Sequence, residues 1–137
     1  MNIYLDIYGT LIANASPIAD RETLLKYILD SFPGRVYWLT SFSPERVIDV
    51  LGREFSELLL GRLETEVNYL SYQHYKSDAI NFDEPFFWLD DNQSEADYYA
   101  LKEHDALSSF IHMNPQDSEM AQKALATIKN SSALNRA

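Results

Sequence analysis

The segment NIYLDIYGTL (residues 2–11) joins an apolar run to an aspartate, a glycine and a threonine. The run Ile3–Ile7 is nearly continuous in apolar side chains, which is typical of a strand buried on both faces of a parallel sheet. Asp6 lies near the end of this run. Because ligand sites in such sheets form at the carboxyl ends of strands, the segment predicts both a fold class and a position for chemistry.

Four other apolar runs also predict strands. They are Val36–Thr40, Leu58–Leu60, Phe86–Asp90 and Ser109–His112. Helices are expected between them. One begins at Ser16-Pro17 and ends at Pro33-Gly34, and the next begins at Ser43-Pro44 and ends at Gly52. A third begins at Ser94-Glu95 and continues through Leu101, and the last is expected over Gln116–Ile128. Strands that alternate with helices predict a doubly wound, mostly parallel, Rossmann-like sheet in a three-layer α/β/α arrangement.

Length and composition predict one domain over residues 1–129 and a flexible polar tail over 130–137. The chain has no cysteine, which excludes disulfides, thiolate metal sites and cysteine nucleophiles. Its net charge of −10 disfavours general binding to nucleic acid phosphates. Neither a signal peptide nor an apolar run of about 20 residues is recognisable. We therefore expect a soluble, cytoplasmic protein without a membrane segment.

Carboxylate and hydroxyl side chains, which can bind a metal ion or a phosphate group, lie at three predicted strand ends. They are Asp6, the pair Thr40-Ser41 and the pair Asp90-Asp91, and Lys76 precedes the third strand. Carboxylates brought together repel one another unless a hard cation such as Mg²⁺ lies between them. Hydroxyls and an ammonium can bind phosphoryl oxygens, and Gly9 allows a turn whose amides face an anion. Asp6 could then attack phosphorus as a nucleophile.

The order of Asp6, Thr40, Lys76 and Asp90-Asp91 resembles the four motifs of the haloacid dehalogenase-like superfamily, over about residues 1–111. The segments Val36–Phe42 and Phe86–Asp91 are also similar to the phosphatase-like domain of RNA-repair multidomain proteins. The resemblance implies that this fold carries a Mg²⁺-dependent phosphohydrolase or phosphotransferase site, acting on a phosphorylated substrate of unknown size.

The resemblance also implies a role for each matching residue. Asp6 would be the nucleophile and a Mg²⁺ ligand, and the main-chain carbonyl of Tyr8 would be another ligand. Asp91 would be the direct acidic ligand, with Asp90 second. Thr40 would act in catalysis by binding the phosphoryl group, and Lys76 by stabilising Asp6 and the transferring charge. The expected substrate-binding residues are Gly9, Thr10, Thr40, Ser41 and Lys76.

Tyr8 departs from the pattern of the phosphatases, which carry a second aspartate at this position as general acid and base. A phenol is a much weaker acid than a carboxyl group, so turnover should be slow or absent. One alternative is therefore a non-catalytic domain that binds metal, phosphate or a partner. Another is a dehalogenase, because Asp6-x-Tyr8-Gly9-Thr10 also occurs in the first motif of those enzymes. The gaps between the motifs leave no room for their helical cap, and a homodimer could supply a lid.

Other residues allow two interpretations. The three-residue spacing of Tyr69, Tyr72 and Tyr75 predicts either a packed helical stripe or a wall near Lys76 that stacks on a ring. Trp38 and Trp88 lie within predicted strands and should belong to the core. The histidines share no metal-ligand spacing, and we expect surface or core positions for His74, His104 and His112.

Overall fold

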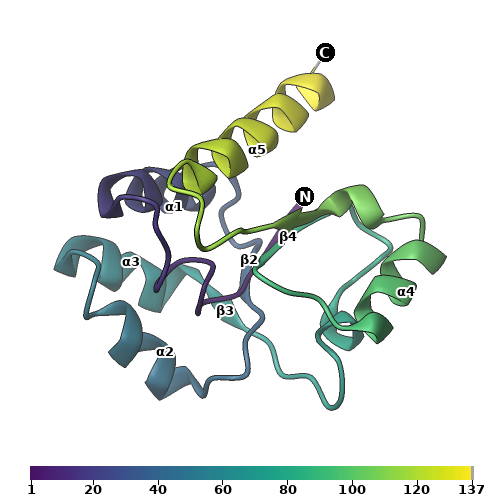
Figure 1. Cartoon of the computed structure of the whole chain (residues 1–137), viewed down its shortest axis with the longest axis horizontal. Coiled ribbons are helices and arrows are strands. Elements are labelled where there is room, and N and C mark those ends of the chain that lie inside the picture. Colours follow the sequence, from purple (N-terminus) through teal and green to yellow (C-terminus); the bar gives the residue numbers. More distant parts are fainter. Residues whose placement is uncertain (137) are drawn as a thin grey trace.

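A five-stranded parallel sheet with the strand order β3-β2-β1-β4-β5 forms the centre of the computed structural model, which describes residues 1–136. The strands are β1 (Asn2–Leu5), β2 (Val36–Trp38), β3 (Asn68–Tyr69), β4 (Phe86–Asp90) and β5 (Phe110–His112). Five α-helices surround the sheet, so the fold is the expected small Rossmann-like α/β domain (Figure 1). Among the residues that the structure describes, no cap is inserted between these elements.

Four of the five strand predictions are confirmed, and the fifth is wrong. The run Leu58–Leu60 belongs to helix α3 (Glu57–Glu66), because the hydroxyl of Ser56 accepts a hydrogen bond from the Leu59 amide at 3.4 Å and caps the helix. Leu59 and Leu63 then lie one turn apart and are both buried. The remaining strand is β3, whose two residues are too few to show an apolar pattern.

The other helices are α1 (Ile18–Ser31), α2 (Pro44–Leu51), α4 (Glu95–Glu103) and α5 (Met120–Arg136). Ser43 and Ser94 cap α2 and α4 as predicted. Ser16 does not cap α1, since its hydroxyl accepts a hydrogen bond from the Ala121 amide at 3.1 Å and so holds the start of α5.

The last helix differs from the prediction at both ends. It begins at Met120 instead of Gln116 and continues beyond Ile128 to Arg136, through most of the stretch expected to be a tail. Asp117 accounts for the later start, because its carboxylate accepts a hydrogen bond from the Glu119 amide at 2.9 Å in the turn before the helix. Ala137 lies outside the described residues.

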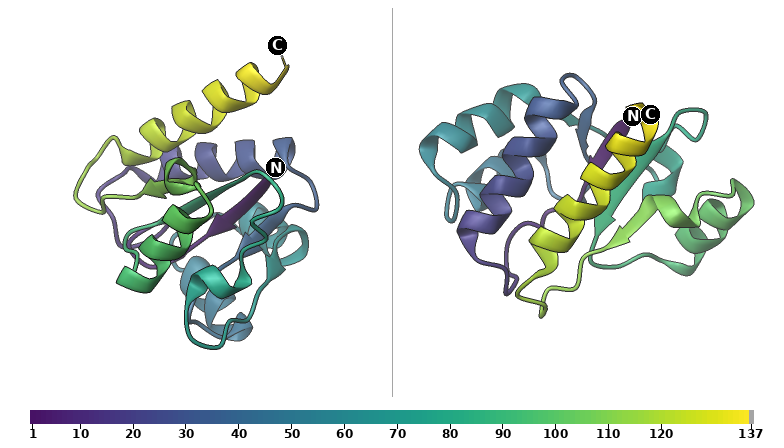
Figure 2. Two further views of the ribbon diagram at one scale, coloured as in Figure 1. Left: turned by 90° about the vertical axis from the view of Figure 1, so that its right-hand side faces the viewer. Right: turned by 90° about the horizontal axis from the view of Figure 1, so that it is seen from above.

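Two apolar clusters pack on opposite faces of the sheet. The larger one joins the sheet to α1, α2, α3 and α5, and includes Trp38. The smaller one lies under α4 and includes Trp88 and Leu101. Figure 2 shows α1 and α5 side by side on the same face. Both tryptophans are therefore core residues, as the sequence predicted.

The tyrosines at positions 69, 72 and 75 do not form a helical stripe. Tyr69 ends β3, Tyr72 lies in the following loop, and Tyr75 immediately precedes the short 3₁₀ helix η1 (Lys76–Ala79). The three-residue spacing thus misled the helical interpretation, because the three tyrosines lie in a strand and in the loop that joins it to η1.

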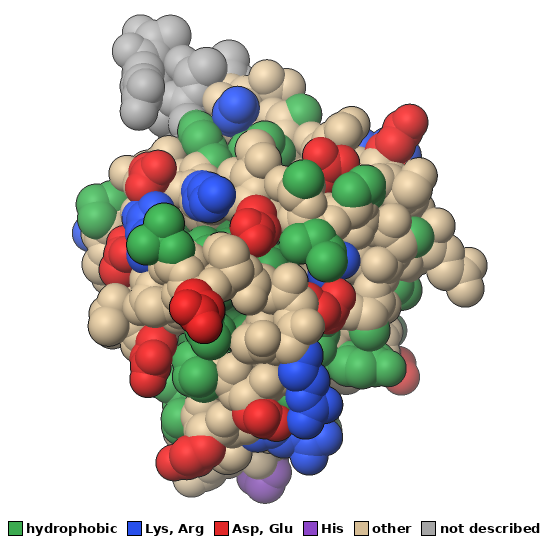
Figure 3. Space-filling model, turned by 90° about the vertical axis from the view of Figure 1, so that its left-hand side faces the viewer, with side chains coloured by type: hydrophobic (Ala, Val, Ile, Leu, Met, Phe, Trp, Pro, Cys, Tyr) green, Lys and Arg blue, Asp and Glu red, His purple; other side chains and the backbone are tan. Residues whose placement is uncertain are grey.

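The surface of the helices carries charges of both signs. Figure 3 shows acidic and basic side chains interspersed on the face that carries α1, α2 and α3. Ion pairs account for part of this pattern, including Arg53 with Asp49 and Arg62 with Asp30. Among the described residues, no helix is both long and apolar enough to cross a membrane.

Candidate functional site

The crevice at the carboxyl ends of β1 and β4 is the topological switch point of the sheet. From β1 the chain proceeds outward through β2 and β3, and it then returns to the other side of β1 to form β4 and β5. Connections on either side of this point diverge, which leaves room for a ligand. Asp6 directly follows β1 and Asp90 ends β4, and the Asp6 amide donates to the Leu89 carbonyl at 3.0 Å.

Three carboxylates meet in this crevice, as the sequence predicted. Asp6, Asp90 and Asp91 each offer one oxygen, and these oxygens lie within 4.8 Å of one another. Asp6 and Asp90 are buried, at 7% and 1% exposure. These carboxylate oxygens are the ligands that a hard divalent cation such as Mg²⁺ prefers, so the chemistry of the donor set fits such an ion.

Lys76 joins two of these carboxylates. Its Nζ lies 3.0 Å from Oδ1 of Asp6 and 2.7 Å from Oδ2 of Asp90. Its side chain is 19% exposed, so the ammonium still reaches the pocket. A lysine far from both aspartates in the sequence thus completes a charge cluster in which buried groups interact strongly.

Asp97 holds the short helix η1 that carries Lys76, and the sequence analysis did not identify this role of Asp97. Its buried carboxylate accepts a hydrogen bond from the Ser77 amide at 3.0 Å, which attaches η1 to α4. The Asp97 amide in turn donates to the capping hydroxyl of Ser94 at 3.1 Å. An aspartate in the first helical turn is ordinary on dipole grounds, so the sequence held no signal of this second task.

The two adjacent aspartates have different surroundings. Asp90 accepts hydrogen bonds from the Trp88 indole N–H and the Asn92 amide, both at 3.2 Å, besides its contact with Lys76. Asp91 is half-buried, and within the described part of the chain its carboxylate accepts no hydrogen bond. The side chain of Asp91 is thus the freer of the two to bind a cation, and Asp90 is held in place by the protein.

The turn after β1 shapes the other side of the crevice. Thr10 is buried, and its hydroxyl donates to Oδ2 of Asp6 at 3.2 Å. Gly9 has a φ of +78°, and a Cβ at this position would overlap Oδ2 of Asp91. Thr10 therefore orients the carboxylate of Asp6, and Gly9 leaves room for that of Asp91. Tyr8, which precedes them, is 61% exposed.

One pocket of about 420 Å³ contains most of the predicted site residues. Its predicted members are Asp6, Tyr8, Thr40, Ser41, Lys76, Asp90 and Asp91. Gly9 and Thr10 do not line it. Thr40 is buried, and its hydroxyl oxygen accepts a hydrogen bond from the Phe42 amide at 3.2 Å. Because that hydroxyl keeps its own proton for donation, it can still bind an oxygen in the pocket.

Burial changes the acidity of the cluster. It raises the pKa of Asp6, against the opposing charge of Lys76. Burial and then the neighbouring charge of Asp6 raise the pKa of Asp90 to about 8. Burial alone would lower the pKa of Lys76, but the carboxylates of Asp90 and Asp6 outweigh it and raise the pKa. Without a metal ion, the single ammonium of Lys76 thus does not offset the negative charge of all the carboxylates in the pocket.

The metal-free protein should lose stability as the pH rises from about 4 to about 8. A carboxyl group whose pKa is 3.8 when unfolded and about 8 when folded binds its proton more tightly in the folded state. Its contribution is therefore present at low pH and is lost as the pH rises through that window. Thermal melting in a chelating buffer measures this effect, and Asp90→Asn should flatten the profile. If the melting temperature of Asp90→Asn depended on pH as steeply as that of the wild type, the effect could not be assigned to Asp90.

Gly9→Ala should destabilise the protein through the turn itself. A left-handed backbone costs an alanine about 1–2 kcal/mol, which corresponds to a melting temperature lower by about 4–8 °C. Gly61 provides the matched control, because it lies in α3 with open space around it. Gly61→Ala should raise the melting temperature by removing a helical glycine. Equal changes of the melting temperature in the two variants would contradict the claim that the left-handed backbone at Gly9 requires a glycine.

Comparisons of the chain with protein-family models, with curated proteins and with solved structures gave no match. The chemistry of the pocket therefore rests on the residues that line it.

Proposed function

We propose that the chain is a Mg²⁺-dependent phosphohydrolase or phosphotransferase of the haloacid dehalogenase-like type, with Asp6 as its nucleophile. The observation that carries the proposal is the placement of the Lys76 ammonium between Asp6 and Asp90, beside Asp91 and Thr40, in one pocket at the switch point of the sheet. A lysine held by two carboxylates supplies the charge that a transferring phosphoryl group requires.

The chain's own residues account for the first half of the reaction. A carboxylate oxygen of Asp6 attacks phosphorus while the bond from phosphorus to the substrate oxygen breaks, which gives an aspartyl-phosphate and an alcohol. Lys76 and the hydroxyl of Thr40 bind the phosphoryl oxygens, and Thr10 keeps the Asp6 carboxylate in position. A Mg²⁺ held by Asp6, Asp91 and the Tyr8 carbonyl, with Asp90 beside them, would neutralise charge on the phosphoryl group.

The reaction also needs a proton for the leaving oxygen in its first half and a base for the attacking water in its second half. A carboxyl group two residues after the nucleophile would serve both needs, but Tyr8 occupies that position and is exposed. The leaving alcohol then takes its proton from solvent, and water hydrolyses the aspartyl-phosphate without help from a base. The proposed enzyme is accordingly slow, and an open pocket without a cap suits a substrate or partner that covers it.

Phosphate release from p-nitrophenyl phosphate tests the proposal directly. The wild-type protein should release phosphate with Mg²⁺ and stop when a chelator removes the metal. Acid-quenched protein should also carry a covalent phosphoryl group, which intact-mass measurement detects. Absence of both turnover and phosphoprotein at high protein concentration would overturn the catalytic proposal.

Tyr8 supports a second candidate, a non-catalytic domain that binds metal and phosphate. Such a domain would retain the cluster of three carboxylates and Lys76 but would lack the acid. Calorimetry would then show Mg²⁺ and phosphate binding in the absence of turnover. Halide release from a 2-haloacid checks the remaining alternative, a dehalogenase, for which an open pocket is unfavourable because the small substrate would stay in contact with water.

A further inference from the structure

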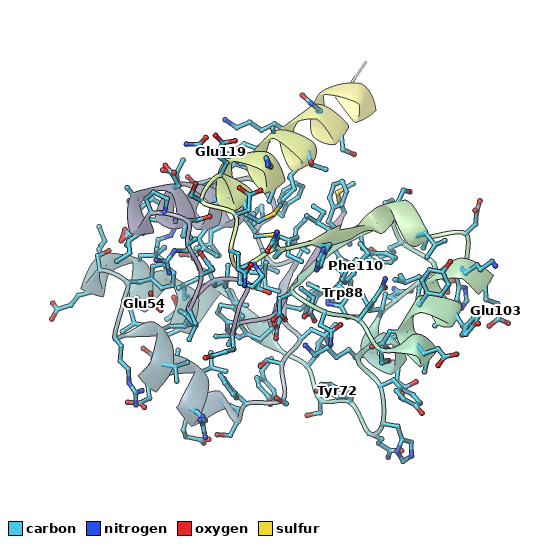
Figure 4. The ribbon with its side chains drawn as sticks, in the orientation of Figure 1. Glu54, Tyr72, Trp88, Glu103, Phe110 and Glu119 are labelled. Carbon is cyan, nitrogen blue, oxygen red and sulfur yellow. The ribbon has the colours of Figure 1, made fainter. Side chains whose placement is uncertain are left out.

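Aromatic side chains surround the mouth of the pocket that holds Lys76. They come from three separate segments of the chain, the loop after β1, the loop after β2 and the loop between β3 and η1. We call this set the aromatic rim, and its members are Tyr8, Phe42, Tyr72, His74 and Tyr75. Figure 4 labels Tyr72, which lies on the loop below the carboxyl ends of the strands.

Packing within the fold does not account for the whole rim. Tyr8 is 61% exposed and Tyr75 is 48% exposed. Neither residue belongs to the two apolar clusters that pack against the sheet, whereas Phe42 and Tyr72 are partly buried against them. Single exposed aromatic rings are common on protein surfaces, but several that converge on one polar pocket mark a binding surface.

The rim is continuous with the groups that bind phosphate. Tyr75 immediately precedes Lys76, and Phe42 follows the hydroxyl pair of Thr40 and Ser41. One ligand can therefore place an anion between Lys76 and Thr40 and a flat apolar ring against the rim. The pocket volume of about 420 Å³ falls within the range of small-molecule sites.

Charge restricts the size of this ligand. The pocket contains three aspartates, and the protein has a net charge of −10. For a long polyanion, the repulsion by these negative charges would weaken binding more than the stacking of one base strengthens it. A single phosphate joined to a single ring avoids this repulsion.

We infer that the substrate is a small phosphomonoester whose leaving group carries a planar aromatic ring, as a nucleoside monophosphate does. The inference rests on the proposed function, because it names the substrate class of the same pocket. The ring stacks on the rim while Lys76 and Thr40 bind the phosphate. Stacking of one base on aromatic side chains corresponds to about 5- to 150-fold in affinity.

Adenosine 5′-monophosphate and ribose 5-phosphate form a matched pair of test compounds, because both have a primary alcohol as leaving group and differ by the base. We expect kcat/KM for the nucleotide to exceed that for the sugar phosphate at least tenfold in Mg²⁺. Dissociation constants measured by calorimetry should show the same ratio. Tyr75→Ala should lower the ratio at least threefold, and Tyr75→Phe should keep it.

Tyr99→Ala is the control, because Tyr99 is an exposed tyrosine of α4 that does not line the pocket. It should leave both rates unchanged. Equal kcat/KM values for the two compounds, with phosphate release intact, would overturn the ring inference and leave the proposed function standing. Tighter binding of the nucleotide without turnover would support the ring inference and overturn hydrolysis. Equal affinities without turnover would overturn both.

Discussion

The Asp6→Asn variant should lose phosphate release almost completely, with kcat lower by more than about 10³-fold. An asparagine fills the same space and can still accept the hydrogen bond from Thr10, but its amide does not attack phosphorus. The variant removes one negative charge from a pocket that has an excess of them, so it should fold at least as well as the wild type. Phosphate release, intact mass after acid quenching and the melting temperature together measure these effects.

Asp83→Asn is the matched control for this experiment, since Asp83 is an exposed aspartate outside the pocket. It removes the same charge and should leave the rate unchanged. If Asp6→Asn and the wild type release phosphate at the same residual rate, the activity comes from another group and Asp6 is not the nucleophile.

The Tyr8→Asp variant should gain activity, by up to about 10²–10⁴-fold in kcat. A carboxyl group two residues after the nucleophile can give a proton to the leaving oxygen and can later take one from the attacking water. Tyr8 is exposed at the mouth of the pocket, so the substitution creates no cavity in the core. The gain should be larger for an alkyl phosphate than for p-nitrophenyl phosphate, because a poor leaving group depends more on an acid.

Tyr8→Asn separates the two effects of this change, since it also removes the ring but supplies no acid. It should show none of the gain. A rate in Tyr8→Asp no higher than in Tyr8→Asn would mean that position 8 does not face the reacting groups, and the slow turnover of the proposed enzyme would then need another explanation.

The parts of the fold that the sequence predicted are those with a local physical cause. Nearly continuous apolar runs identified β1, β2, β4 and β5, and capping serines marked the starts of α2 and α4. The errors arose where distant residues decide the structure. Ser16 resembles a helix cap, but its hydroxyl is used by Ala121 of a helix far along the chain.

The site shows the same division. Carboxylates at strand ends were predictable, because parallel strands bring their carboxyl ends to one edge of the sheet. The task of Asp97 was not predictable, because it depends on how α4 packs beside η1. A pattern of residue types likewise does not specify that Tyr8 is 61% exposed or that Gly9 is left-handed.

The strand pairing around β1 gives the two sides of the pocket different freedom to move. Asp6 and Asp90 stand on neighbouring central strands, in which Asn2 pairs with Phe86 and Leu5 pairs with Leu89. Those strands separate only when the whole sheet unfolds. Lys76 instead stands on one short turn that the Asp97 carboxylate attaches to α4. The pocket therefore has one wall held by strand pairing and another whose lysine depends on a single short turn and on its ion pairs with Asp6 and Asp90.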